Sequence, residues 1–430
     1  MEVSIIHYHL NPGGVTRVIE SQIAGIKSIT PKTNLQVLCG QANQPVVAHD
    51  VPAIVEPALG YSAVSDRNEY SHSVNSINDF FRFHLKGNPV FHFHNPTLGK
   101  NPAVTFSAYL LASKGIPVVY HCHDFAEDRM NNFSLLNSTI PAYSGVSLGK
   151  VMYPDYPNCH FVVLNSCDYT RILNAGIDSS RVHLLPNPVV IQTALHATQK
   201  VERRARICKA LSINPGKKIC TYPVRLIARK NPGEFILLAA LFQDTAEFVV
   251  TLPPKNPQEL PQYEFWKAFC SRNGLKIIFE AGEQVNHEEL MNISDFCITT
   301  SIREGFGMVY LEPWLTGTPV IGRRLPCITE DLVKQGVTFP RLYDHILVKS
   351  GGKVVDFGDV NHEEQAELIQ SVTQENSAKE AMISQNPFLA SLFSDVTDSI
   401  IRENQQVISD SYSIEAYGKE LLGIYREISR

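Results

Sequence analysis

The chain alternates between short apolar runs and longer amphipathic stretches along most of its length. The apolar runs are hydrophobic at nearly every position, as expected of strands in a parallel sheet covered on both faces. The predicted strands lie at 3–9, 35–40, 89–94, 116–123, 160–165 and 182–186, and then at 217–224, 246–252, 275–281, 295–301 and 318–323. Helical stretches, such as 15–28, separate them. This alternation predicts an α/β fold with two doubly wound, Rossmann-like domains.

The two sets of strands are separated near residues 188–205. We therefore place an N-terminal domain at 1–190 and a C-terminal domain at 191–410. Segment 324–410 is less regular, so it is assigned to the second domain without individual elements. Residues 411–430 predict an amphipathic helix, with Ser411 or Ser413 as its N-cap.

Length, charge and cysteine content narrow the class of protein. A chain of 430 residues exceeds the usual size of a single core, in agreement with two domains. A net charge of −5 does not favour nucleic-acid binding. The nine cysteines form no C-x-x-C pair, which argues against a zinc ribbon or a thioredoxin-like motif.

The N-terminal sequence and the hydropathy pattern indicate where in the cell the protein is expected. No basic segment followed by an apolar one opens the chain, so no signal peptide is evident. No apolar run approaches 18 residues, so no membrane-spanning helix is predicted. We expect a cytoplasmic protein, and peripheral membrane contact stays open.

In doubly wound sheets, ligands bind beyond the carboxyl ends of the strands. The first such stretch is NPGGVTR at 11–17. Gly13 and Gly14 permit a sharp turn and leave helix N–H groups uncovered, which favours an anion. An ordinary β–α turn explains a Gly-Gly pair as well, and on its own is the favoured interpretation. The G-x-G-x-x-G spacing of a nicotinamide dinucleotide site is absent.

Two His-x-His pairs, FHFHN at 91–95 and YHCHD at 120–124, each end a predicted strand. Residues two apart share one face of a strand, so the pairs invite a metal hypothesis in which Asp124 is a further ligand. More often, one histidine of such a pair packs under the sheet end and the other faces the ligand. His94 and His123 stand later in their strands and are the candidates for that second role.

The stretch YPVRLIARKN at 222–231 sets Arg225 and Lys230 five residues apart, just past a predicted strand. An arginine fork and a lysine point charge both suit a phosphate. A solvated basic turn is the alternative, and the favoured one for this stretch alone.

The stretch SIREGFGMVYLEPWLTG at 301–317 combines two carboxylates with two glycines. Glu304 lies in the turn before a predicted helix at 307–317, and Glu312 lies within that helix. Gly305 and Gly307 leave bare backbone for the phosphates of a nucleotide. Glu312 suits the vicinal hydroxyls of a ribose, and Glu304 suits a sugar ring. Pro313 is expected to weaken or kink the helix. In the alternative interpretation, Glu304 caps the helix and Glu312 is solvated.

Together these stretches resemble the retaining, GT-B-fold glycosyltransferases of family 4 (glycosyl transferases group 1). The most specific element is EGFGMVYLE at 304–312, followed by GTPVI at 317–321. RLIARK (225–230), NPGGVTR, HCHD (121–124) and LLPNPV (184–189) resemble the family's other motifs in order. Val224 and Asn231 stand where many relatives have glycine, and Pro313 where a small helix former is usual, which should alter loop geometry more than chemistry.

The resemblance implies that the C-terminal domain binds a nucleotide-activated sugar and the N-terminal domain, joined by the helix at 411–430, binds most of the acceptor, with reaction in the cleft between them. Glu304 would contact the donor hexose, Glu312 the ribose, and Arg225 and Lys230 the leaving diphosphate. The implied catalytic residues are His123, Arg225, Lys230 and Glu304. The implied donor-binding residues are Gly13, Gly14, Asn187, Arg225, Lys230, Gly305, Phe306, Gly307, Met308, Val309 and Glu312, and the implied acceptor-binding residues are His94, Asn95 and Asp124.

The implied reaction is a metal-independent transfer of a hexosyl group, with retention, from a UDP- or GDP-linked sugar to an acceptor hydroxyl. No cofactor or bound metal is expected beyond this co-substrate. The acceptor is a small molecule, a glycan or a lipid. Two other functions stay open: a metal-dependent hydrolase that uses the His-x-His pairs, and a non-catalytic sugar-nucleotide-binding protein.

Overall fold

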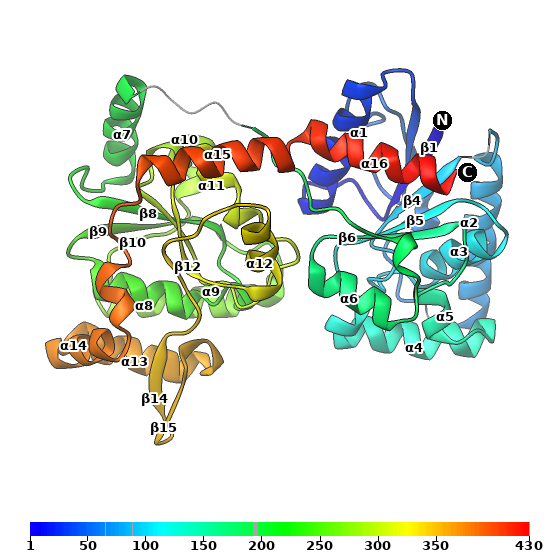
Figure 1. Ribbon diagram of the computed structural model, residues 1–430. Helices are drawn as coiled ribbons and strands as arrows, with labels where there is room; N and C mark the ends of the chain where they lie inside the picture. The colour runs from blue at the N-terminus through cyan, green and yellow to red at the C-terminus, as the bar shows by residue number, and fades with distance from the viewer. Residues whose placement is uncertain (65, 88, 192–196, 430) are drawn as a thin grey trace. The chain divides into compact units, whose positions relative to one another are not determined.

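The computed structural model describes residues 1–64, 66–87, 89–191 and 197–429. Its contacts divide the chain into two compact units. The N-terminal unit comprises residues 1–190 together with 410–430, and the C-terminal unit comprises 191–409 (Figure 1). Each contains one parallel sheet, which confirms the predicted α/β class with two doubly wound domains. None of the described helices is long and apolar enough to cross a membrane.

The sheet of the N-terminal unit has the strand order β3-β2-β1-β4-β5-β6-β7, and all its pairs are parallel. Its strands are β1 (Glu2–His7), β2 (Asn34–Cys39), β3 (Ala53–Val55), β4 (Val90–His94), β5 (Val118–Cys122), β6 (Cys159–Val163) and β7 (Val182–Leu184). Its helices are α1 (Gly14–Ile29), α2 (Arg67–Phe83), α3 (Pro102–Ser113), α4 (Met130–Ser144), α5 (Leu148–Met152), α6 (Ser166–Asn174) and α16 (Ile414–Ile428). The strand order reverses between β1 and β4, which makes their carboxyl ends the expected ligand site.

The two faces of this sheet bury different sets of side chains. Helices α1 and α16 cover the face that carries Ile5 and Val119, and they run side by side in Figure 1. Helices α2 and α3 cover the face that carries Phe93 and Tyr120. Ser413 caps α16 by accepting a hydrogen bond from the amide of Ala416, at 3.2 Å. The C-terminal helix thus completes the hydrophobic core of the N-terminal unit.

The sheet of the C-terminal unit has the order β10-β9-β8-β11-β12-β13, again all parallel, and β14 and β15 form a separate hairpin. Its strands are β8 (Lys218–Arg225), β9 (Ala246–Leu252), β10 (Ile277–Ile278), β11 (Phe296–Thr299), β12 (Val320–Arg323), β13 (Leu342–Tyr343), β14 (Leu347–Ser350) and β15 (Lys353–Asp356). Its helices include α7 (Ala197–Leu211), α8 (Pro232–Phe242), α9 (Leu260–Arg272), α10 (His287–Ile293), α11 (Glu312–Leu315), α12 (Pro326–Lys334), α13 (His362–Gln374) and α14 (Asn376–Gln385). Helix α15 (Asp398–Tyr412) follows in the chain. The order reverses between β8 and β11.

One predicted helix differs from the observed structure. The segment 307–317 forms a 3₁₀ turn at Met308–Tyr310 and then the short helix α11, instead of one continuous helix. Pro313 is the physical reason, because it has no N–H to bond the carbonyl one turn earlier. Glu312 therefore begins α11 and does not lie two turns inside a helix.

Candidate functional site

The reversal of strand order in the C-terminal unit brings together residues from two loops. Lys230 ends the 3₁₀ turn that follows β8, and Glu304 follows β11, the neighbouring strand. The amide of Ile302 donates to the carbonyl of Arg229 at 3.1 Å, which ties the two loops together. Parallel strands end at the same edge of the sheet, so residues 74 positions apart meet here.

Glu304 is the centre of a charged cluster. Lys230 Nζ donates to its Oε1 atom, Arg229 Nη1 donates to Oε2 at 2.9 Å, and Ser301 Oγ donates to Oε1 at 2.7 Å. The side chains of Lys230 and Glu304 are only 9% and 6% exposed. Burial acts to raise the pKa of Glu304, but the charges of Lys230 and Arg229 outweigh it and hold that pKa below its ordinary value. Glu304 is therefore a carboxylate at neutral pH, and a strong acceptor.

Two hydroxyl groups fix the backbone of Lys230 by hydrogen bonds to its carbonyl oxygen. Thr300 Oγ1 donates to its carbonyl at 2.9 Å, and the hydroxyl of Tyr222 donates to the same oxygen. The next residue, Asn231, has φ of +51°, a left-handed conformation that asparagine tolerates better than most residues. Glycine, which the family resemblance leads one to expect here, would meet the same requirement. Asparagine is therefore compatible with this loop conformation.

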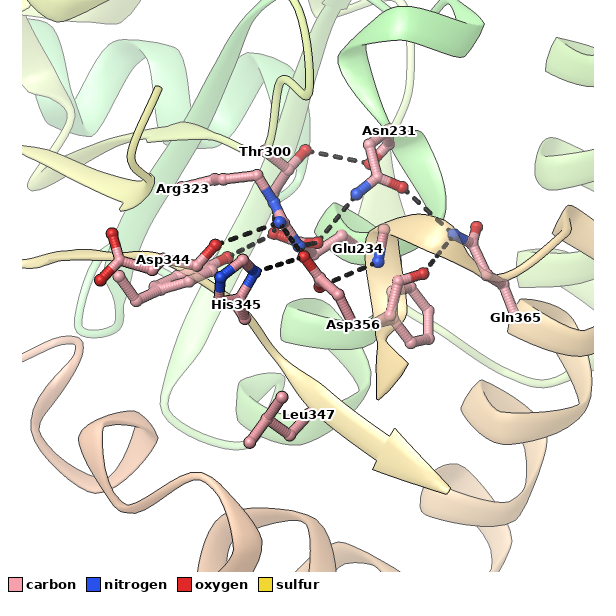
Figure 2. A network of polar contacts seen from close by, with 12 residues as sticks. Asn231, Glu234, Thr300, Arg323, Asp344, His345, Leu347, Asp356 and Gln365 are labelled. Carbon is pink, nitrogen blue, oxygen red and sulfur yellow. Dashed lines mark hydrogen bonds and ion pairs between the residues drawn. The ribbon is translucent and has the colours of Figure 1, made fainter. Parts of the chain in front are cut away.

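Asn231 also joins a buried network, which Figure 2 shows. Its Nδ2 atom donates to Glu234 Oε2 at 2.8 Å, and Gln365 Nε2 donates to its Oδ1 at 3.3 Å. Arg323 forms ion pairs with Glu234 and with Asp356. Fully buried charges are tolerated when they are paired and hydrogen-bonded in this way. The network fixes the start of α8 and, with it, the position of Lys230.

The glycine-bearing loop between Glu304 and α11 depends on Gly307. This residue has φ of +82°, and a Cβ there would lie 2.8 Å from Tyr310 Cδ2. Glycine is therefore required at this position. Phe306 and Val309 are buried, and Gly305 and Met308 are half-buried.

Arg225 ends β8 and is half-buried. Its Nη1 atom donates to the carbonyl of Pro253 at 2.7 Å, which directs the guanidinium along the end of the neighbouring strand β9. Arg225 thus ends β8 and Lys230 follows it, and of these two residues Lys230 bonds to Glu304.

The corresponding loop of the N-terminal unit contains Gly13 and Gly14. Gly13 precedes α1 with φ of −174°, an extended conformation that any residue can adopt. A Cβ on Gly14 would meet no atom of the unit within 4 Å. Backbone strain therefore does not require these glycines, and their effect is to leave the start of α1 uncovered. Asn187, in the loop after β7, is buried, and its Oδ1 has no partner in the described structure.

The four histidines of the two His-x-His pairs form a buried stack. His92 and His94 alternate with Phe91 and Phe93 along β4, so both point to the face covered by α1 and α16. His94 Nδ1 lies 2.8 Å from His123 Nε2. Burial lowers the pKa of both His92 and His123 to about 3. These imidazoles are neutral at physiological pH.

The proposed acceptor residues have different surroundings. His94 is 2% exposed and both its ring nitrogens bond within the unit, so it supports His123 and offers no free nitrogen. Asn95 is buried, and its Oδ1 accepts the amides of His123 and Asp124 at 2.7 and 3.0 Å. Asp124 is partly exposed and pairs with Arg129 at 2.9 Å. Asn95 therefore shapes the loop, and Asp124 reaches solvent.

Two groups in the described residues have nitrogen and oxygen atoms close enough to surround a metal ion. One is His92, His94 and His121, and the other is His160, His183 and Glu427. In the first, His92 Nε2 lies 3.1 Å from His121 Nδ1, so two of the three rings already bond to each other. The Asp124 carboxylate, proposed as a further ligand, pairs with Arg129 outside this group.

Sequence reasoning missed several residues that build these sites. Arg229 could have been noticed, because it lies beside Lys230 in the same basic stretch. Ser301 is three residues before Glu304, a spacing that often brings side chains together in a turn. Gln22 and Tyr425 bond to the histidine stack, and no local pattern in the sequence marks them.

The sequence is similar to a family of glycosyltransferases and to two related enzymes. Residues 204–387 match the family model described as Glycosyl transferases group 1. Mannosylglucosyl-3-phosphoglycerate synthase of Petrotoga mobilis is 27% identical over 386 residues, which is 86% of this chain and 74% of that protein. Mannosylglucosylglycerate synthase of the same organism is 26% identical over 275 residues, 56% of this chain and 60% of that protein.

Solved structures resemble the whole chain. Anabaena HepE in complex with UDP-glucose has a TM-score of 0.59 at 15% identity, over 98% of both chains. Sucrose-phosphate synthase of Thermosynechococcus elongatus has a TM-score of 0.63 at 14% identity, over 100% of this chain and 99% of that chain. With the family match and the two parallel sheets, these similarities identify the chain as a GT-B glycosyltransferase, a hexosyltransferase enzyme.

Proposed function

We propose that this protein transfers a hexosyl group, with retention of anomeric configuration, from a nucleotide-diphosphate sugar to a hydroxyl of an anionic acceptor, as a cytoplasmic member of family 4. The observation that carries the proposal is the cluster of Lys230, Arg229 and Glu304 where the strand order of the C-terminal unit reverses. It places two cations and a carboxylate at the edge where doubly wound sheets bind ligands.

In this proposal, the C-terminal unit binds the donor. Lys230 and Arg225 neutralise the charge that develops on the departing diphosphate, a form of electrostatic catalysis. Glu304 accepts hydrogen bonds from the hexose hydroxyls once Lys230 turns to the phosphate. Glu312, the first residue of α11, binds the ribose, and the backbone of 305–309 approaches the phosphates. The relative solved with UDP-glucose supports a UDP-linked donor, and a GDP-linked donor is the alternative.

Two observations support an anionic acceptor: a group of side chains in the N-terminal unit, and the similarity to mannosylglucosyl-3-phosphoglycerate synthase. Lys100 lies over the ring of Tyr61, 5.6 Å from its centroid, and Tyr61 lies within 3.2 Å of His9 Nε2. Burial raises the pKa of Tyr61, and the charges of Arg129 and Asp124 also act on that pKa. In the chain, His9 follows β1, Tyr61 follows β3 and Lys100 follows β4. Asp124 and Arg129 follow β5. This set of side chains suits a phosphate- or carboxylate-bearing acceptor, in keeping with a relative that synthesises mannosylglucosyl-3-phosphoglycerate.

The proposed reaction needs no metal ion or other cofactor. Lys230, Arg225 and Arg229 supply the positive charge that a divalent cation supplies elsewhere. The competing hydrolase proposal rests on the His92, His94 and His121 group. Dialysis against EDTA separates the two, because full transfer activity after dialysis contradicts a metal requirement, whereas a stoichiometric metal that restores activity contradicts our proposal.

The function is tested by binding and by product analysis. Thermal unfolding is followed with UDP, GDP and ADP sugars, since a ligand at 100 times its Kd stabilises a protein by about 2.7 kcal/mol. The stabilising donor is then incubated with 3-phosphoglycerate and its glycosides, and NMR reads the anomeric configuration of the product. We expect one donor to stabilise the protein and the product to keep the donor's configuration. No response to any nucleotide sugar would refute the proposal, and an inverted product would refute retention.

A further inference from the structure

A chain of hydrogen bonds links the C-terminal helix to His123 through the interior of the N-terminal unit. Gln22 Nε2 donates to the hydroxyl of Tyr425 at 2.6 Å, and Gln22 Oε1 lies 2.8 Å from His94 Nε2. His94 Nδ1 lies 2.8 Å from His123 Nε2. Gln22 is on α1 and Tyr425 on α16, and both are fully buried.

The orientation of the Gln22 amide determines which atom donates in each hydrogen bond of this series. Gln22 Oε1 is a carbonyl oxygen, so His94 Nε2 must carry the proton that bonds to it. A neutral imidazole has one proton, so His94 Nδ1 is an acceptor. His123 Nε2 must then donate to it, which leaves His123 Nδ1 without a proton. The orientation of the Gln22 amide therefore determines the tautomer of His123, to which it is linked through His94 by two hydrogen bonds.

The same orientation of the Gln22 amide also determines which ring nitrogens of His92 and His121 carry a proton. The hydroxyl of Tyr425 accepts from Gln22, so its own proton is directed to His92 Nδ1, at 2.8 Å. His92 Nε2 then donates to His121 Nδ1, at 3.1 Å. His121 Nε2 ends the chain and has no partner among the described residues. If the Gln22 amide were reversed, every proton in the chain would move to the other nitrogen.

The reversed arrangement would change what His123 presents to a substrate. Within the described part of the chain, His123 Nδ1 makes no hydrogen bond, and the residue is 7% exposed. In the observed arrangement this nitrogen is an acceptor, whereas in the reversed one it is a donor. A sugar hydroxyl that donates to Nδ1 would be bound by the first arrangement and repelled by the second.

We propose that Gln22 and Tyr425 are positioning residues that hold His123 in the Nε2–H tautomer, so that its Nδ1 accepts a hydrogen bond from a substrate hydroxyl. The part of the proposal that concerns a substrate rests on the proposed glycosyl transfer. The part that concerns the tautomer does not. The C-terminal helix thereby acts on the chemistry of His123 as well as on the core of its unit.

The tautomer can be measured directly by NMR of histidines labelled with ¹³C and ¹⁵N, with the His123 signals assigned by comparison with His123→Asn. We expect His123, His94 and His92 all to carry the proton on Nε2 in the unliganded enzyme. The Tyr425→Phe variant removes the acceptor for the Gln22 amide, so both amide orientations become accessible. We expect a mixture of His123 tautomers in this variant. We also expect kcat to fall roughly three- to tenfold, the effect of one hydrogen bond, at unchanged KM for the donor.

The matched control is Tyr417→Phe on the same helix. Tyr417 is equally buried, but its hydroxyl has no partner in the described structure, so its loss should change neither the tautomer nor kcat. Should Tyr425→Phe fail to fold, Gln22→Met removes the same link with a side chain of similar length. A proton on His123 Nδ1 in the wild type, or a tautomer unchanged in the variant that folds, would overturn the proposal. A tautomer shift without any measurable transferase activity would leave the positioning intact and refute the proposed function alone.

Discussion

Lys230 and Glu304 form a buried ion pair that joins the loops after β8 and β11, and Arg229 completes the pair from the solvent side. The carboxylate that we propose for the donor sugar is thus held by the cation that we propose for the donor phosphate. In our proposal, donor binding exchanges this contact for one between Glu304 and the sugar and one between Lys230 and the phosphate. Recognition of the sugar would thereby be linked to recognition of the diphosphate.

Replacement of either member of this pair should strongly reduce turnover. We expect Lys230→Ala and Glu304→Gln each to lower kcat by about 100-fold or more, because each removes charge that stabilises the transition state. The assay is the release of nucleoside diphosphate in the presence of donor and acceptor. Lys349→Ala, on the exposed hairpin, is the matched loss of a lysine and should leave the rate unchanged. Near-normal rates in both site variants would contradict the assignment.

The same pair should also contribute to stability, although loop positions would suggest otherwise. Removing one partner of a buried pair leaves an uncompensated charge, which costs about 3–5 kcal/mol. The double variant Lys230→Met with Glu304→Gln removes both charges and should recover most of that loss, but none of the activity. Urea unfolding followed by tryptophan fluorescence measures this, since Trp266 and Trp314 both lie in the C-terminal unit. Additive losses in the double variant would show that the two side chains do not interact.

Asn231 should matter through its backbone as well as its side chain. Asn231→Ala and Asn231→Gly both lose the hydrogen bond to Glu234, but only alanine is strained at φ of +51°. We therefore expect the glycine variant to be the more stable by about 1 kcal/mol, measured by tryptophan fluorescence in urea. Equal stability of the two variants would mean that the left-handed conformation imposes no cost at this position.

The sequence was informative where local pattern determines structure. Apolar runs located most strands of both sheets, but not the short edge strands β3 and β13. The residues Glu304, Glu312, Arg225 and Lys230 suggested a site for a nucleotide-linked sugar. The Lys230–Glu304 contact could not be predicted, because strand order and not sequence distance brings residues 74 positions apart together. Pro313 was expected to weaken or kink the helix, and the segment is interrupted there: the turn Met308–Tyr310 ends before it and α11 begins at Glu312.

The histidines show a second limit of sequence reasoning. Period-two alternation correctly placed His92 and His94 on one face of β4, but it could not say what covers that face. The covering residues, Gln22 and Tyr425, come from opposite ends of the chain. Their side chains bond to His94 and His92 and join the contacts between the rings into one series of hydrogen bonds. The local sequence thus determined the orientation of these histidines, whereas contacts with residues distant in the sequence determined their hydrogen bonding.

Close packing of α1 on α16 should depend on two facing glycines. A Cβ on Gly418 would lie 2.4 Å from the carbonyl carbon of Gly25, so Gly418→Ala must push the helices apart. Such overpacking costs about 1–3 kcal/mol. Gly423→Ala on the same helix meets nothing within 4 Å and should be neutral or stabilising. Amide hydrogen exchange in α1 measures both variants, and faster exchange in the first alone is expected. Equal exchange in the two would contradict the close approach of the helices.

Acid should destabilise the N-terminal unit well before its carboxylates titrate. Burial lowers the pKa of His92 and His123 to about 3, whereas an unfolded histidine has a pKa near 6.5. Between these values the unfolded state binds more protons, so stability is complete above about pH 6.5 and is lost as the pH falls. Each such histidine contributes on the order of 1 kcal/mol per pH unit across that window.

Hydrogen exchange of peptides from β4 and β5 measures this effect, because both tryptophans report on the other unit. After correction for the intrinsic exchange rate, the free energy of opening should stay constant from pH 7.5 to about 6.5 and then fall towards pH 5. His92→Gln should make this free energy less dependent on pH, by the contribution of one buried histidine. An opening free energy that stays constant from pH 7.5 to 5 would mean that the stack accepts protons in the folded state. The neutral chain from Tyr425 to His123 would then not exist at physiological pH.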